Sequence, residues 1–403
     1  MGGGLMQLVA YGAQDIYLTG NPQITFFKVV YRRHTNFSME AIEQTWNGSD
    51  GNGTPTAGRC TATISRNGDL VHKMYIEVQA VAHASADQKN ISSQSITNVE
   101  LEIGGQKIDK HSGQWMETWA ELTQPNPSIK AGLVGGAIQS IGTPFQLMSG
   151  MGGVSVHDDG VASVFYIPLQ FWFCRNPGLA LPLIALQYHE VKVILDHDFS
   201  NGFASGLTQK LWCDYIYLDT DERRRFAQVS HEYLIEQVQE QSLSTIGGSN
   251  DLNFNHPVKE LIWTKFTSGA VVKLDSGTGD TLVTTDTYQL KLNGHDRFAQ
   301  RHVSYFTKTQ VNQHHSGCGG ILVPTGGDIL ANAAAAALTG VNGIAVYSFA
   351  LKPEEHQPSG TCNFSRIDNA QLVAGSTCVA DTIYAVNYNV LRIMSGMGGL
   401  AYS

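Results

Sequence analysis

One β-hairpin pattern occurs twice in this chain of 403 residues, and the repeat restricts the possible folds more than any other feature. Residues 99–103 alternate apolar and charged side chains, which is the period of a half-buried strand. Gly104-Gly105 follows and supplies the positive φ angles of a tight hairpin turn. The same pattern returns at residues 288–298, where Asn293-Gly294 stands at the turn. The sequence therefore predicts one β architecture that is present in two copies.

Other matching segments follow in the same order along the chain. Ile42-Glu43-Gln44 matches Ile235-Glu236-Gln237 at an offset of 193 residues, and the hairpin repeats at an offset of 189. Further along, segment 165–169 matches 346–350, and segment 177–178 matches 358–360, both at an offset of 181. Each copy then ends in a strand-like run, at 211–218 and at 386–394. A steadily falling offset is expected when the second copy has shorter loops, whereas chance matches would scatter. We therefore interpret the chain as a tandem duplication.

Strand-like runs with turn signals about every ten residues, and few helical patterns, indicate an all-β protein. At about eight strands per copy, we predict two tandem antiparallel jelly-roll sandwiches, with a few short helices in loops and linker. The predicted boundaries are an N-terminal arm at 1–24, a first jelly roll at 25–218, a linker at 219–230 and a second jelly roll at 231–403. Asp219 or Thr220 is expected to cap a short helix in the linker. Asn67-Gly68, between two strand-like runs, predicts a further hairpin turn.

The composition argues against several kinds of partner. A net charge of −9 is unlike the basic footprint of a nucleic-acid-binding protein, and the basic run 223–225 is offset by the acidic residues just before it. No run of 18 apolar residues occurs, so no membrane-spanning helix is expected, and the first residues lack the pattern of a signal peptide. The six cysteines form no Cys-x-x-Cys spacing, so we expect reduced thiols and synthesis in the cytosol.

Motifs for catalysis, cofactors and metals are absent or incomplete in the sequence. There is no phosphate-binding loop and no Gly-x-Ser-x-Gly elbow. The candidate metal and acid-base sites are His189-Glu190, His231-Glu232, the stretch 196–202, His314-His315 with Cys318, and Asp158-Asp159. The first two lack a second histidine four residues on, the third departs from a calcium loop, and the fourth lacks a further ligand. A solvated loop tip explains Asp158-Asp159 more simply, and we predict no enzyme activity, no cofactor and no metal.

Asparagine sequons offer possible glycosylation sites. Five occur, at Asn36, Asn47, Asn52, Asn90 and Asn363. Asn47 and Asn52 lie in a polar, glycine-rich turn and are expected to be the most accessible, and Asn90 is kept as a third candidate. Asn36 and Asn363 border apolar strand residues and are expected to be unmodified. The lack of a signal peptide argues against the ordinary secretory route for any of them.

Long strings of residues resemble the major capsid proteins of nucleocytoplasmic large DNA viruses, especially those of algal, chlorovirus-type viruses. The strings are 8–37, 64–70, 177–182, 187–191, 231–237, 357–370 and 387–402, so they run from end to end of the chain. Segments 111–160 and 266–343 do not match. The resemblance implies a double jelly roll whose homotrimer forms a capsomer of hexagonal outline, and capsomers that tile an icosahedral shell.

The resemblance also implies the partners and the location of the protein. It implies contacts with neighbouring capsomers and with minor capsid and penton proteins, an inner virion membrane that is near but not spanned, and no direct contact with nucleic acid. The protein is expected in the virion after synthesis in the host cytoplasm. The alternative hypothesis is a jelly-roll viral surface protein that binds glycans through an exposed aromatic residue such as Trp115 or Trp119.

Overall fold

The computed structural model describes residues 6, 12–22, 24–26, 33–80, 82–83, 88–125, 131–134, 137–140, 143–152, 156–157, 163–244, 248–267, 270–271, 287–317, 319, 343–375 and 380–402. The chain forms two compact units, residues 1–37 and residues 38–403. The first unit contains the short helix α2 (Ile16–Thr19). Tyr17 and Leu18 of this helix and Phe26 after it are exposed. The predicted boundary of the arm at residue 24 stays a prediction. In the described residues, the first strand of a sandwich is β1 (Phe37–Gln44).

The first sandwich consists of two antiparallel sheets, which we call sheets A and B. Sheet A has the order β1 (Phe37–Gln44), β16 (Thr208–Leu218), β4 (Leu70–Ala80) and β12 (Ser163–Pro168), with β13 (Leu181–Pro182) also paired to β4. Sheet B has the order β2 (Trp46–Gly48), β3 (Ala57–Thr63), β14 (Val191–Asp198), β7 (Ile96–Ile103) and β8 (Gln106–Ser112). Their inner faces bury alternate residues, such as Ile76 and Val78 of β4 and Leu101 of β7, in one apolar core.

The second sandwich consists of sheets C and D. Sheet C has the order β17 (His231–Ser242), β28 (Thr382–Met394), β19 (Pro257–Thr264) and β25 (Ala345–Ser348), with β26 (Cys362–Asn363) on β19 and β29 (Met397–Leu400) on β28. Sheet D has the order β18 (Ser249–Asp251), β27 (Ala370–Ala374), β22 (Thr287–Leu292) and β23 (His295–Asp296), with β24 (Arg301–His302) on β22. Leu261, Leu290 and Ile383 lie in the core between these sheets.

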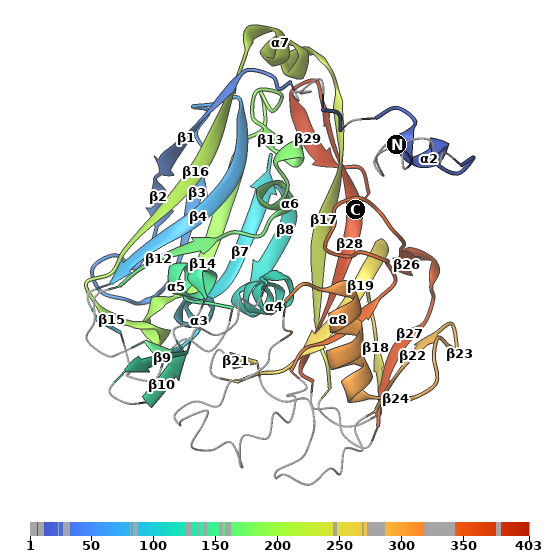
Figure 1. Cartoon of the computed structure of the whole chain (residues 1–403). Coiled ribbons are helices and arrows are strands. Elements are labelled where there is room, and N and C mark those ends of the chain that lie inside the picture. Colours follow the sequence, from blue (N-terminus) through green and yellow to red (C-terminus); the bar gives the residue numbers. More distant parts are fainter. Residues whose placement is uncertain are drawn as a thin grey trace. The chain divides into compact units, whose positions relative to one another are not determined.

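The two sandwiches have the same strand order. The order β1-β16-β4-β12 in sheet A corresponds to β17-β28-β19-β25 in sheet C, and β3-β14-β7-β8 in sheet B corresponds to β18-β27-β22-β23 in sheet D. The matched segments lie in corresponding strands, except that 177–178 and 358–360 lie in the loops that follow β12 and β25. The predicted all-β double jelly roll is therefore confirmed, with eight corresponding strands per sandwich in the described residues (Figure 1).

The two repeated hairpins have turns of the same geometry. Gly104 and Gly105, between β7 and β8, have φ of +58° and +84°, and Asn293 and Gly294, between β22 and β23, have φ of +50° and +76°. Positive φ at both central residues is the requirement of a type I′ turn.

The hairpin expected at Asn67-Gly68 is not formed. β3 before it belongs to sheet B and β4 after it belongs to sheet A, so the segment crosses from one sheet to the other. A turn-forming dipeptide does not specify whether the flanking strands pair with each other. Gly68 is required for packing instead, because a Cβ there would lie 2.8 Å from the Cβ of Tyr215.

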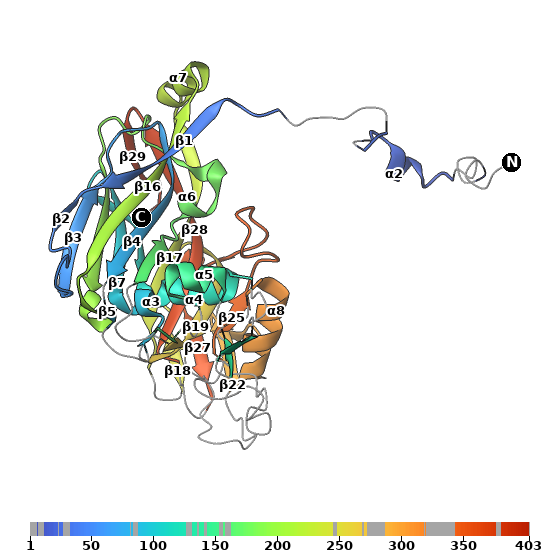
Figure 2. The ribbon, with the colours of Figure 1, turned by 60° about the vertical axis from the view of Figure 1, so that its left-hand side comes forward.

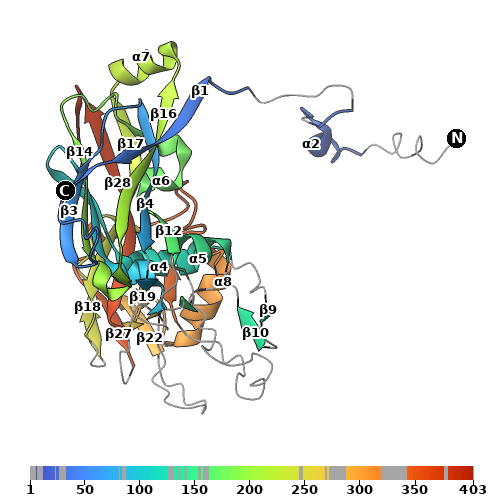
Figure 3. The same ribbon diagram turned by 90° about the vertical axis from the view of Figure 1, so that its left-hand side faces the viewer.

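Helices are short and lie between strands or at the ends of sheets. They are α3 (Ile91–Ser95), α4 (Gly113–Thr123), α5 (Pro144–Ser149), α6 (Trp172–Arg175), α7 (Thr220–Gln228) and α8 (Val311–His314), with the turns η1 (Pro177–Leu179), η2 (Phe199–Asn201), η3 (Tyr305–Gln310, a π-helix) and η4 (Phe364–Arg366). The carboxylate of Asp219 accepts a hydrogen bond from the N–H of Thr220, so the predicted cap of the linker helix is confirmed in α7. α7 connects the two sandwiches at one end, and α3, α4 and α5 gather away from it (Figures 2 and 3).

Four pairs of short strands complete the described structure. They are β5 (Ala82–His83) with β15 (Phe203–Ser205), β6 (Gln88–Lys89) with β11 (Val156–His157), β9 (Ala131–Val134) with β10 (Ala137–Ser140), and β20 (Phe266–Thr267) with β21 (Ala270–Val271).

Candidate functional site

The junction between the two sandwiches is the most extensive buried polar feature that we find in the described structure. Its apolar part is formed by α4 of the first sandwich, which lies on the face of sheet C that points away from sheet D; we call this the outer face. Trp115, Trp119 and Leu122 of α4 pack with residues of sheet C that include Tyr384 and Val386. The rings of Trp115 and Tyr384 are 5.1 Å apart between centroids. α4 is therefore held by the second sandwich as well as by its own.

α4 begins at the junction because its N-terminus is capped. The Ser112 hydroxyl accepts a hydrogen bond from the N–H of Trp115 at 3.2 Å, which satisfies one of the free amides of the first turn. The same hydroxyl donates to the Glu240 carboxylate of β17 at 2.9 Å. The cap thus connects the two sandwiches.

A cluster of charges surrounds Glu236 on β17. Arg175 of α6 contacts one carboxylate oxygen at 3.0 Å, and Lys259 of β19 contacts the other at 2.8 Å. His356 lies 3.7 Å from the same oxygen as Lys259. Burial raises the pKa of Glu236, but Arg175, His356 and Lys259 outweigh burial and lower the pKa to about 2. Glu236 is therefore an anion that joins Arg175 of the first sandwich to Lys259 of the second.

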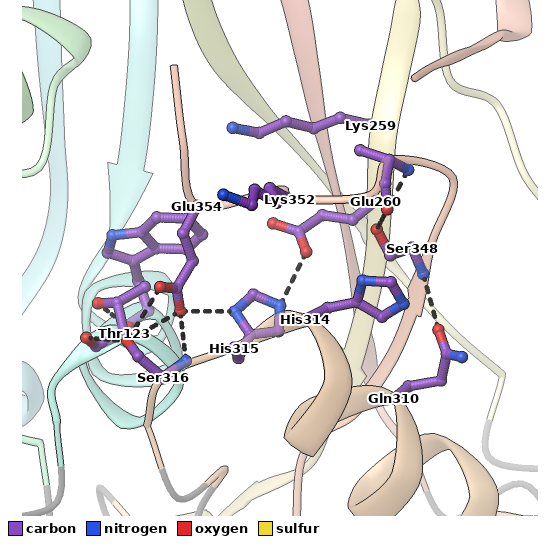
Figure 4. Close-up of polar contacts among 12 residues, drawn as sticks. Thr123, Lys259, Glu260, Gln310, His314, His315, Ser316, Ser348, Lys352 and Glu354 are labelled. Atoms are coloured by element: carbon purple, nitrogen blue, oxygen red, sulfur yellow. Dashed lines mark hydrogen bonds and ion pairs between the residues drawn. The ribbon is translucent and has the colours of Figure 1, made fainter. Parts of the chain in front are cut away.

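His315 forms a second buried cluster beside the first (Figure 4). Its Nε2 lies 2.9 Å from the Glu260 carboxylate and its Nδ1 lies 3.1 Å from that of Glu354. Burial alone would lower the pKa of His315, but the two carboxylates outweigh burial and raise the pKa to about 9. The imidazole is therefore a cation at neutral pH, and it donates to both neighbours.

The residues after His315 bind the C-terminal end of α4. The Ser316 hydroxyl donates to the carbonyl of Thr123 at 2.9 Å, and the N–H groups of Gly317 and Gly319 donate to the carbonyls of Leu122 and Glu121. The last carbonyls of a helix have no partner inside the helix. Here the second sandwich supplies the donors, so its backbone completes a helix of the first sandwich.

The edge strands β8 and β17 meet along the other side of the junction. The Gln237 amide donates to the carbonyl of Ile108, and the N–H of Val238 donates to the Asp109 carboxylate at 3.2 Å. A groove of about 610 Å³ follows these strands, with Lys110 and Tyr402 among its lining residues. The apolar, ionic and edge contacts together fix the second sandwich against the first.

The sequence-predicted metal candidates have other partners in the structure. His189 bonds to the backbone of Gly398, and His231 bonds to the carbonyl of Phe226. Asp198 accepts from the Ser200 hydroxyl, as a turn would require. The described residues contain no group of three or more His, Cys, Asp or Glu side chains that could hold a metal ion. Cys318 and Asp158-Asp159 lie outside the described residues.

His315 was considered in the sequence only as a metal ligand, and its ion-pair role was missed. Its partners Glu260 and Glu354 are 55 and 39 residues away in the chain, so no local spacing indicates them. Arg175 and Glu236 were likewise not identified as partners. The shared Ile-Glu-Gln string was a signal that residue 236 is structurally important, but not that it is ionised and buried.

The expected exposure of Trp115 and Trp119 is wrong. Their exposed fractions are 1% and 4%, because the second sandwich covers α4. These tryptophans cannot form the sugar platform of the alternative hypothesis.

Among the helices that the structure describes, none combines the length and the apolar character that crossing a bilayer requires.

The predicted glycosylation sites differ in accessibility. Asn47 on β2 is exposed. Asn52 is exposed too, but its amide donates to Asp50 and accepts from the N–H of Gln209. Asn90 is only 2% exposed. Glycosylation stays a prediction, and Asn47 and Asn52 are the exposed positions among the three candidates, although Asn36 and Asn363 are exposed as well.

Two family models match almost the whole chain. Residues 25–219 match the model described as "Major capsid protein N-terminus", and residues 222–327 and 333–399 match "Large eukaryotic DNA virus major capsid protein". Among curated proteins, the major capsid protein of Pyramimonas orientalis virus is 54% identical, and that of Paramecium bursaria Chlorella virus 1 is 41% identical, each with 100% of both chains covered.

Solved structures agree with the sequence comparison. The capsid protein VP54 of the virus PBCV-1 matches with a TM-score of 0.72 and 36% identity, over 94% of this chain and 100% of that one. The Faustovirus major capsid protein, at 13% identity and a TM-score of 0.66, shares the fold. The chain therefore belongs to the family of major capsid proteins of large eukaryotic DNA viruses.

Proposed function

We propose that this chain builds the viral shell as a homotrimeric capsomer, in which six sandwiches from three chains give a hexagonal outline. The observation that carries the proposal is the pair of sandwiches with one strand order, fixed to each other by a buried junction. A rigid unit of two similar bodies can form a closed ring with cyclic symmetry from three copies. One chain can then tile a large surface by near-sixfold contacts.

The junction supports a structural function because its buried charged groups are paired with one another and hold the two sandwiches together. Its carboxylates Glu236 and Glu260 are paired with Arg175, Lys259 and His315, each at 3.0 Å or less. We propose that the protein is not an enzyme and needs no cofactor.

The proposal extends to location and partners. In the virion, the capsomer would contact neighbouring capsomers and minor capsid and penton proteins, near the inner membrane but without spanning it, and without direct contact to nucleic acid. Synthesis would take place in the host cytoplasm, and the jelly rolls would correspond to residues 25–218 and 231–403, joined by 219–230. Weak contacts suffice between capsomers because many act together.

Light scattering of the purified chain at micromolar concentration tests the proposal. We expect a mass of three times 43.8 kDa that persists on dilution. A monodisperse monomer would contradict it. Mass spectrometry of purified virions should find this chain as a highly abundant protein, and the same spectra report any glycan mass at Asn47.

A further inference from the structure

Five Asn-Gly pairs lie in the described residues, and they differ in how firmly the structure holds them. The pairs begin at Asn47, Asn52, Asn67, Asn201 and Asn293, and a sixth, at Asn342, lies outside the described residues. We propose that Asn67-Gly68 is a site of spontaneous covalent modification, at which the asparagine of the folded chain converts to isoaspartate and aspartate. The inference goes beyond the proposed function and does not depend on it.

Asparagine followed by glycine can react without an enzyme. The Gly68 nitrogen attacks the side-chain carbonyl carbon Cγ of Asn67, a bond forms between these two atoms, and the bond from Cγ to Nδ2 breaks. The side-chain nitrogen leaves as ammonia and takes the proton of the Gly68 N–H. Water then opens the cyclic imide at either of its carbonyls, which gives aspartate or isoaspartate. Glycine favours the first step because it has no side chain that hinders the attacking nitrogen.

Exposure does not distinguish the five pairs, because all five asparagines are exposed. Hydrogen bonds do distinguish them, and the pair at Asn52 is held at both reacting groups. Its side-chain amide donates to the Asp50 carboxylate and accepts from the N–H of Gln209. The N–H of Gly53 donates to the carbonyl of Leu207 at 2.7 Å. Neither the attacking nitrogen nor the carbon that it would attack is free to move.

The pairs at Asn293 and Asn201 are each held at one reacting group. The side-chain oxygen of Asn293 accepts from two backbone N–H groups of segment 368–369. The N–H of Gly202, which follows Asn201, donates to the carbonyl of Phe199 at 3.2 Å. Ring closure would require breaking these hydrogen bonds.

The backbone of Asn47 is held although its side chain is exposed. Asn47 belongs to β2 and lies opposite Thr61 of β3. Ring closure requires rotation about the bond between Cα and the carbonyl carbon of the asparagine, and this rotation would disrupt the pairing of the two strands. We therefore expect Asn47 to react more slowly than Asn67.

Asn67-Gly68 has none of these restraints. The pair lies between β3 and β4, outside any strand or helix. Among the described residues, neither the Asn67 side chain nor the Gly68 N–H has a hydrogen-bond partner. The exposed amide and the attacking nitrogen can therefore approach each other without loss of a contact.

The residues on either side of the pair are anchored, so the product should affect stability. The Arg66 guanidinium donates to the backbone carbonyls of segment 186–187, and the Asp69 carboxylate lies 2.9 Å from Arg223. Isoaspartate directs the main chain through the former side chain, which adds one carbon between these two anchors. Aspartate adds the negative charge without the carbon. We expect isoaspartate to destabilise the segment that crosses from sheet B to sheet A.

Peptide mapping by mass spectrometry tests the site after incubation of the full-length chain near neutral pH, with a fragmentation method that separates isoaspartate from aspartate. In the folded chain we expect modification at Asn67 to be at least tenfold faster than at Asn52 and Asn293. In the chain unfolded by urea the three rates should become similar, because the same dipeptide is then free at each position. A rate at Asn67 in the folded chain no higher than at Asn52 and Asn293 would overturn the proposal.

Two variants test the effect on stability. Asn67→Gln keeps an amide but would have to form a larger ring, which closes more slowly, and Asn67→Asp carries the charge of the product without the additional carbon. After equal incubation, the native chain should melt at a lower temperature than Asn67→Gln, whereas freshly prepared Asn67→Asp should melt with the fresh native chain. Equal melting temperatures of the incubated native chain and Asn67→Gln, with isoaspartate present at residue 67, would contradict the expected destabilisation.

Discussion

Sheets A and C have the same strand order but opposite surroundings on their outer faces. Sheet A exposes Met39 and Tyr166, whereas sheet C buries Tyr384 and Val386 under α4. The edge strands repeat the contrast in one shared string, Ile-Glu-Gln. In β1 the glutamate of this string is Glu43, which forms an exposed ion pair with Lys210. In β17 it is Glu236, which lies in a buried cluster of charges. The neighbour of a strand, and not its position in the jelly roll, decides which side chains it needs.

The contrast separates two kinds of electrostatic contact. Glu43 and Lys210 are 3.1 Å apart but 46% and 38% exposed, and exposed pairs contribute roughly 0–1 kcal/mol to stability. Glu236 is buried between Arg175 and Lys259. If the glutamate charge is removed, the two cations stay buried without an anion to compensate them.

The largest difference between the two strands should come from neutralising these glutamates. Glu236→Gln is expected to lower the free energy of unfolding by about 3–5 kcal/mol, because Arg175 and Lys259 stay buried without an anion. The matched change Glu43→Gln should cost less than about 1 kcal/mol. Urea denaturation of both variants measures the two values. Equal effects at the two positions would show that the junction is not an ionic anchor.

The pH dependence of stability should also distinguish the junction from the open face. His315 has a pKa raised to about 9 in the folded chain, so its contribution is complete below its ordinary value near 6.5 and is lost as the pH rises through about 9. The loss should be on the order of 3 kcal/mol. Glu236, with a pKa lowered to about 2, loses its contribution as the pH falls from about 4.5 to about 2.

Melting curves between pH 6 and pH 10 test the alkaline side. His315→Gln should flatten the decline and start from a lower stability, whereas His295→Gln, on the exposed strand β23, should leave the decline unchanged. A decline of the same size in His315→Gln would assign it to other groups.

The two hairpins should respond alike, because their turns have the same backbone geometry. Gly105→Val and Gly294→Val place a β-branched residue at φ of +84° and +76°, and no atom lies within 4 Å of the added Cβ in either turn. Each should therefore cost about 1–2 kcal/mol from backbone strain alone. Melting temperatures equal to that of the unmodified chain would contradict the positive-φ turn at that position.

The smallest expected effect is at the end of α4. Ser316→Ala removes the hydroxyl that lies 2.9 Å from both the Thr123 carbonyl and the Glu354 carboxylate and can donate to either, while the N–H groups of Gly317 and Gly319 remain bound. We expect a cost of about 1 kcal/mol in urea denaturation. Ser38→Ala, at an exposed position of β1, is the control. No measurable difference between the two would mean that the hydroxyl adds nothing to the backbone contacts.

The sequence predicted features that depend on local pattern and on the repeat. Alternation, turn residues and falling offsets indicated the double jelly roll, and Asp219 indicated the start of α7. Alternation, turn residues and a helix cap are visible within about ten residues of sequence, and the offsets are visible by comparing two similar segments. The hairpin expected at Asn67-Gly68 fails because a turn signal does not say which sheet the next strand joins.

The junction could not be predicted in the same way, because its partners are far apart in sequence and differ from copy to copy. Trp115 packs on Tyr384, which is 384 − 115 = 269 residues away in the chain, and Arg175 contacts Glu236, which is 236 − 175 = 61 residues away. The repeat itself misleads here, since Glu43 and Glu236 have the same neighbours in sequence and opposite environments in space.

The rate at which hydroxyl radicals oxidise Met39, compared between dissociated chain and assembled trimer, tests the central claim most directly. Met397 is the internal reference, because the two methionines are 50% and 52% exposed in the single chain. If three chains form the proposed ring of six sandwiches and sheet A faces its neighbour there, Met39 should be oxidised at least fivefold more slowly in the trimer, while the ratio of the two rates stays near one in the dissociated chain. A Met39 rate in the trimer equal to that in the dissociated chain would contradict the proposed ring.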